Sequence, residues 1–123
     1  MNVPLIGGLL PLPKALPYGA AMELALTGGF ITGIRAYELG LVARLAEPGR
    51  SLNVATAVAA DIAANAPLAL MATKAILTGT TKWTDAEAFV WQRGISEPVF
   101  LSDDAQEGAR AFAEKRKPQW QGR

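Results

Sequence analysis

Signals for the start of a helix recur along the whole sequence, and they constrain the fold more than any other feature. Each is a proline suited to a first helical turn, or a hydroxyl side chain that can cap one, ahead of a short segment with apolar residues three or four apart. These residues are Pro17, Thr32, Ser51, Pro67, Thr84 and Ser102. No strand–helix–strand alternation and no fixed repeat accompanies them. The sequence therefore predicts a mainly α fold with five or six short helices.

The turn signals bound these segments. Thr84 with Glu87 three residues later forms a capping box, and the helix after it is expected to reach about Arg93. Interruptions are expected near Gly94 and Pro98, because proline removes a helical hydrogen bond. Residues 41–45 are apolar and short, which allows one strand at most. The other helices are expected at 20–26, 33–39, 51–64, 68–77 and from Ser102 onward.

The chain has 123 residues and contains neither histidine nor cysteine. A Ser-His-Asp triad, a thiolate metal site and a disulfide are therefore excluded, and acid–base chemistry would fall to Asp, Glu, Lys or Tyr. The formal net charge of +1 disfavours a dedicated nucleic-acid binder. Without about eighteen uninterrupted apolar residues, no membrane span is expected. The start of the sequence lacks the basic region of a signal peptide, so a cytoplasmic location is expected.

Charge is distributed unevenly along the chain. Before Arg35 the only charged side chains are Lys14 and Glu23. A segment so apolar is expected to lie against more protein, because an independent small domain needs a larger solvated face. Glu23 could be a buried catalytic carboxylate with a raised pKa, but a solvated helix face is the favoured interpretation.

The last twenty residues combine an acidic start, a small-residue middle and a basic end, which is typical of a short helix whose charges match its dipole. Phe112 and Lys115 are three residues apart and are expected to share one helix face. Pro118 is expected to stop the helix, with Trp120 following. The basic run 115–117 would cap the helix end or bind a phosphate. The arrangement suits holding a flat aromatic group beside a phosphate, or docking the tail on another subunit.

Asp103, Asp104 and Glu107 form the one acidic cluster in this segment. They could be considered as metal ligands. The favourable position of the two aspartates at the positive end of the helix explains them with no further assumption. No metal site is therefore predicted.

Seven segments together resemble the C-terminal part of the crotonase superfamily, the enoyl-CoA hydratase/isomerase family. They are LLPLPKALP (9–17), AMELALTG (21–28), AYELGLV (36–42) with Arg44, IAANAPL (62–68), ATK (72–74), SDDAQEG (102–108) and AFAEKRKP (111–118). Each segment alone is weak, and their order and spacing together are specific. The resemblance covers nearly the whole chain and implies the helical C-terminal portion of the crotonase fold.

The resemblance implies a set of functional expectations. Family members act on acyl-CoA thioesters, hydrating 2-enoyl-CoA or moving its double bond in fatty-acid metabolism, with acyl-CoA as substrate and no cofactor. They form trimers, often paired into hexamers, so a homo- or hetero-oligomer is expected. In the family motif a phenylalanine and a lysine of the last helix contact the CoA of a neighbouring subunit. Carried over, these residues are Phe112 and Lys115.

The resemblance also implies what these residues do not include. In the family an N-terminal half carries the oxyanion hole and the first catalytic glutamate, and the second glutamate lies just ahead of the segment that opens this sequence. Residues 1–13 are then the glycine- and proline-rich loop after that half, and 14–123 the helical domain. The isolated chain is expected to be truncated and inactive. The alternatives are a non-catalytic helical module that assembles with full-length crotonases, or a gene fragment without a role of its own.

Overall fold

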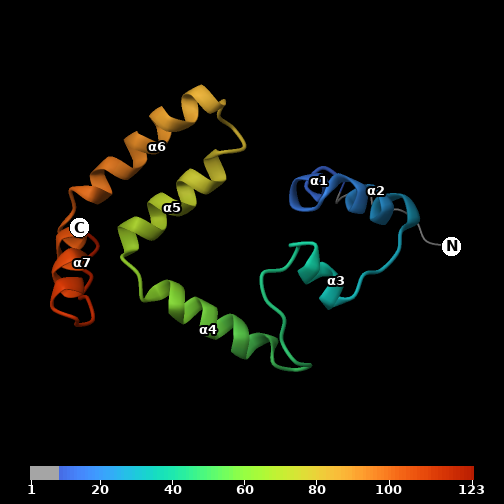
Figure 1. The fold of residues 1–123 in the computed structure, drawn as a ribbon, viewed down its shortest axis with the longest axis horizontal. Coiled ribbons are helices and arrows are strands. Elements are labelled where there is room, and N and C mark those ends of the chain that lie inside the picture. Colours follow the sequence, from blue (N-terminus) through green and yellow to red (C-terminus); the bar gives the residue numbers. More distant parts are fainter. Residues whose placement is uncertain (1–8) are drawn as a thin grey trace. The chain divides into compact units, whose positions relative to one another are not determined.

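The computed structural model describes residues 9–123, and within them it contains seven α-helices and no strand (Figure 1). The helices are α1 (Leu12–Ala15), α2 (Tyr18–Thr27), α3 (Gly33–Glu38), α4 (Ser51–Ala63), α5 (Pro67–Gly79), α6 (Asp85–Phe100) and α7 (Asp103–Ala113). The mainly α class is confirmed, with the four-residue α1 as an additional short helix. The chain divides into two compact units, Met1–Ala55 and Thr56–Arg123, and α4 crosses their boundary.

The first unit holds α1, α2 and α3, whose ends follow the predicted signals. The Thr32 hydroxyl accepts the Arg35 N–H at 3.1 Å and caps α3. Gly28 and Gly40, with φ of 61° and 77°, take the left-handed position after α2 and α3. Residues 41–43 form bends and residues 44–45 have no regular structure, so the possible strand at 41–45 does not form. Most of the predicted loop 1–13 lies outside the described residues.

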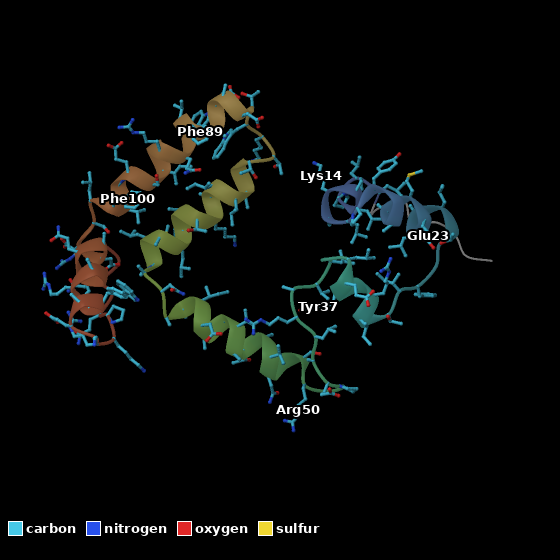
Figure 2. All side chains as sticks on the ribbon, in the orientation of Figure 1. Lys14, Glu23, Tyr37, Arg50, Phe89 and Phe100 are labelled. Carbon is cyan, nitrogen blue, oxygen red and sulfur yellow. The ribbon has the colours of Figure 1, made fainter. Side chains whose placement is uncertain are left out.

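Only small patches of this unit are buried. Among its described residues, 9–55, the buried apolar side chains are those of Leu16, Ala21 and Ala36. Glu23 lies exposed on α2 (Figure 2), as the solvated-face interpretation of this carboxylate expects.

The second unit is built on a hairpin of α5 and α6, which lie side by side (Figure 1). The Trp83 and Trp91 rings stack at the turn, with centroids 6.1 Å apart and planes inclined by 10°. A Cβ atom at the buried Gly79 would collide with the Trp83 ring, so glycine is required where α5 ends. The wide spacing of the tryptophans in the sequence did not indicate this stack.

The predicted interruption of the helix after Thr84 is wrong. The capping box forms as expected, with the Thr84 N–H donating to the Glu87 carboxylate at 2.9 Å, but α6 continues through Gly94 and Pro98 to Phe100. Pro98 lies in the last turn and removes one helical bond, that to the Gly94 carbonyl, and only Val99 and Phe100 follow it in the helix. The carbonyl that faces the proline ring belongs to Gly94, which has no side chain to add to the crowding.

The large apolar side chains of α6 are mostly uncovered. Phe89 and Phe100 were natural candidates for buried anchors, yet they are 78% and 77% exposed (Figure 2). The helix contacts α5 and α7 within its unit. Both units therefore expose apolar surface that a stable soluble fold ordinarily covers.

Within residues 9–123, no single helix is long and apolar enough to cross a membrane. Helices α4 and α5 have the required length and hydropathy only when taken together, and they are bent by 110° relative to each other.

Candidate functional site

The start of α7 is fixed by Ser102. Its hydroxyl accepts the Ala105 N–H at 3.1 Å and donates to the Val99 carbonyl at 2.6 Å. The cap therefore satisfies a free donor of α7 and ties the helix to the end of α6. Asp103 and Asp104 occupy the first turn, as the sequence predicts.

Asp104 does more than complement the helix dipole, and this role was missed in the sequence. It is 2% exposed, and its two carboxylate oxygens accept the backbone N–H groups of Gln121 at 2.7 Å and Gly122 at 2.9 Å. Its own N–H donates to the Arg123 carbonyl at 3.1 Å. The last three residues are thus folded back onto the start of α7.

Trp120 completes this attachment. Its indole N–H donates to the Ala64 carbonyl at 2.7 Å, and a Cβ atom at Gly108 would lie 3.3 Å from its ring. Here the tail docks on its own unit.

Glu107 and Arg116 form the strongest ion pair of the segment. Two guanidinium N–H groups of Arg116 donate to the two oxygens of Glu107 at 2.6 and 2.9 Å, and the Gln119 N–H donates to the same carboxylate at 2.9 Å. The hydrogen bond from Arg116, followed by that from Gln119, lowers the pKa of Glu107 from 4.5 to about 2. Arg116 also donates to Glu114 at 2.6 Å, and the two carboxylates raise the arginine pKa.

Helix α7 ends in a Schellman motif. The Arg116 N–H donates to the Ala111 carbonyl at 3.0 Å, and the Lys115 N–H donates to the Phe112 carbonyl at 3.2 Å. Lys115 occupies the left-handed position with φ of 53°, and it is the only non-glycine residue with positive φ among residues 9–123.

The same motif ends α3, where the left-handed position is occupied by glycine. There the Leu41 N–H donates to the Ala36 carbonyl at 2.9 Å, and the Gly40 N–H donates to the Tyr37 carbonyl at 3.0 Å. Lys115 thus stands where this chain elsewhere uses the residue without a steric penalty.

The prediction that Phe112 and Lys115 share a helix face is wrong, because α7 ends at Ala113 and Lys115 lies beyond it. Pro118 follows a helix that the Schellman motif has already ended. The two candidates are nevertheless joined by the hydrogen bond between their backbones. Phe112 is 87% exposed and Lys115 is exposed, and among the described residues no partner engages the Lys115 ammonium. An exposed aromatic ring and a cation without a partner among the described residues therefore both occur at the end of α7.

A polar hollow of about 450 Å³ opens beside α7, but neither candidate residue lines it. Its walls are Asp103, Asp104, Gln106, Glu107, Arg110, Arg116, Gln119, Gln121 and Arg123. Asp104 and Glu107 already accept tail amides and the Arg116 fork. No group of three metal-ligating side chains occurs in the described part of the chain.

Comparison with known families gives one match along almost the whole sequence. The sequence model described as Enoyl-CoA hydratase/isomerase matches residues 2–123. The chain is 42% identical over 120 residues to the Mycobacterium tuberculosis protein named Enoyl-CoA hydratase EchA19, covering 98% of this chain and 45% of the relative. It is 38% identical to a Carnitinyl-CoA dehydratase of Salmonella arizonae, covering 98% of this chain and 48% of that protein. The chain thus spans about half the length of the curated relatives it matches.

Solved structures agree with the sequence relatives. A crystal structure of enoyl-CoA hydratase from Mycobacterium tuberculosis H37Rv superposes with a TM-score of 0.91 at 55% identity, over 95% of this chain and 46% of that one. That of enoyl-CoA hydratase EchA1 from Mycobacterium marinum gives 0.90 at 53% identity, again over 95% and 46%.

Proposed function

Because the chain belongs to the enoyl-CoA hydratase/isomerase family, we propose that the end of α7 supplies part of an acyl-CoA binding site. In this proposal Phe112 packs against the adenine of CoA, and Lys115 meets one of its phosphates. The site is completed by protein that these 123 residues do not contain, in an oligomeric assembly of the family type. Processing of 2-enoyl-CoA in cytoplasmic fatty-acid metabolism is the corresponding role.

The observation that carries this proposal is the left-handed conformation of Lys115. A non-glycine residue in that region costs stability and persists mainly where its side chain is needed. The lysine ammonium has no partner among residues 9–123 and so is available to an anion. The exposed ring of Phe112, attached through the backbone bond to Lys115, adds the flat apolar surface that a purine requires.

The chemistry of the family reaction lies elsewhere in this proposal. The resemblance assigns the oxyanion hole and both catalytic glutamates to segments outside these residues, and without the hole the thioester enolate is not stabilised. We therefore expect the purified 123-residue chain to leave 2-enoyl-CoA unhydrated. A spectrophotometric hydration assay tests this, and turnover clearly above background would contradict it.

Binding is tested by NMR titration of the chain with CoA. Lys115→Ala should weaken the affinity about three- to five-fold at low ionic strength, as expected for one exposed charge contact, and less at high salt. Lys117→Ala is the matched control, because it removes an equal charge two residues away. If the two variants bind CoA equally, the lysine is only a helix-end charge.

A second candidate function follows from the exposed apolar side chains. Phe30, Phe89 and Phe100 lie uncovered in their units, as expected if further protein packs there. The chain would then be a non-catalytic helical module that assembles with full-length crotonases. Co-purification with a full-length family member tests this role, and a monodisperse monomer in its presence would count against it.

A further inference from the structure

Arg116, the residue after Lys115, is paired with two carboxylates. Its Nε donates to Glu114, the residue before the lysine, at 2.6 Å, while its terminal N–H groups hold both oxygens of Glu107. The bond between the Glu114 and Arg116 side chains therefore spans the left-handed residue. A fork of two parallel bonds to Glu107 fixes the orientation of the guanidinium as well as its distance.

The same ion pair also attaches the backbone after Lys115 to α7. Glu107 lies in the second turn of α7 and accepts the N–H of Gln119, four residues beyond the lysine. With the bond from the Arg116 N–H to the Ala111 carbonyl, this fastens the backbone on the C-terminal side of Lys115 to the body of the helix. The strained φ of Lys115 is thus enforced from outside the residue itself.

Arg116 also engages the acidic side chain next to Lys115 in the sequence. Glu114 directly precedes the lysine and Glu107 lies in α7, and both are paired with the arginine. Removal of Arg116 would take this partner from both carboxylates and leave the adjacent Glu114 available to the lysine. With Arg116 in place, the ammonium has no partner among residues 9–123.

We propose that Glu107 and Arg116 are positioning residues for Lys115: the fork between them holds the lysine in its left-handed conformation and keeps its ammonium free for an anionic phosphate. This proposal rests on the proposed function. Glu107 and Arg116 need not touch the ligand, so their effect on affinity must pass through Lys115.

The test is a double-mutant cycle on the full 123-residue chain, with CoA as the probe in NMR titrations. Glu107→Gln should weaken CoA affinity about two- to three-fold and speed amide hydrogen exchange at Arg116 and Gln119. Arg116→Lys keeps the charge but cannot form the fork, and should weaken affinity similarly. The combination of Glu107→Gln with Lys115→Ala should bind no more weakly than Lys115→Ala alone.

The controls separate this proposal from the function on which it rests. Arg110→Gln removes one charge from an exposed position of α7 that has no hydrogen-bond partner, and should change affinity less than Arg116→Lys. If Lys115→Ala weakens CoA binding but Glu107→Gln does not, or if the two effects add fully, positioning is wrong and the proposed function stands. If Lys115→Ala leaves CoA affinity unchanged, both are wrong.

Discussion

Replacing Lys115 with glycine should raise the stability of the chain and lower its affinity for CoA. Most substitutions at a binding residue leave stability unchanged or reduce it. Here the opposite sign is expected, because Lys115 occupies the left-handed region with φ of 53° and a Schellman motif places it there. Glycine adopts that conformation without a clash between Cβ and the carbonyl oxygen.

The magnitude follows from two opposing terms. The left-handed conformation costs a residue with a side chain about 1–2 kcal/mol. Glycine gives back about 0.5–1 kcal/mol, because it has more conformational freedom to lose on folding. The net gain in the free energy of unfolding is then roughly 0.5–1 kcal/mol, which corresponds to a rise in melting temperature of about 2–8 °C for a unit of this size.

Far-UV circular dichroism measures the melting temperature, and an NMR titration measures CoA affinity on the same samples. Lys115→Ala separates the two effects, since it removes the ammonium but keeps the strained conformation: affinity should fall and the melting temperature should change little. Gly40→Ala is the reverse control in α3, and should cost about 1 kcal/mol. A Lys115→Gly variant that melts at or below the wild-type temperature would refute the strain argument, and one that binds CoA as tightly as wild type would refute the contact.

Three further substitutions test the rest of the site and its support. Asp104→Asn should destabilise the chain by about 2 kcal/mol, because a buried carboxylate that accepts two tail N–H groups loses one acceptor and its charge. Asp85→Asn, at an exposed position in the first turn of α6, is the control in thermal melts, and equal melting temperatures would contradict the attachment of the tail by Asp104. Gly79→Ala should lower the free energy of unfolding by about 1–3 kcal/mol, because the new methyl group meets the Trp83 ring. The near-UV circular dichroism of the stacked tryptophans should weaken as well. An unchanged spectrum and melting temperature would mean that the ring moves aside freely. The pKa of Glu107 is lowered from 4.5 to about 2 in the folded chain. The carboxylate should therefore stabilise the folded chain fully above about pH 4.5, and this stabilisation should be lost as pH falls toward 2. Thermal melts of wild type and Glu107→Gln against pH check this, and equal melting temperatures of the two proteins at about pH 6 would contradict it.

Helix starts were predictable because their physics is local. A capping hydroxyl and the N–H that it satisfies are three residues apart, so both partners lie within one short segment of the sequence. Thr32 accepts the Arg35 N–H, Ser102 accepts the Ala105 N–H, and Thr84 pairs with Glu87, all as expected. The family resemblance drew on the same short segments and led to the correct fold class.

The contacts that hold the tail were not predictable in this way. Asp104 meets Gln121 and Gly122 only because the chain turns back after α7, and Trp120 reaches Ala64, 56 residues earlier. No spacing rule connects such residues, and an aspartate in a first helical turn has a sufficient local explanation in the helix dipole. That explanation was incomplete for both aspartates, since Asp103 also pairs with Arg123 of the tail at 3.3 Å.

The special backbone position of Lys115 was not predicted, because the sequence analysis placed the end of α7 too late. Helical periodicity continues smoothly through 115–117, so in the sequence this lysine is one cation among three near a helix end. Once α7 is known to end at Ala113, the same lysine becomes the residue after the cap, where Gly40 stands in the equivalent motif of α3. Glycine is preferred at this position where the side chain has no role, because it adopts the left-handed conformation without steric cost. In the proposed function the lysine is retained because the CoA phosphate requires its charge, while Arg116 engages Glu107 and Glu114.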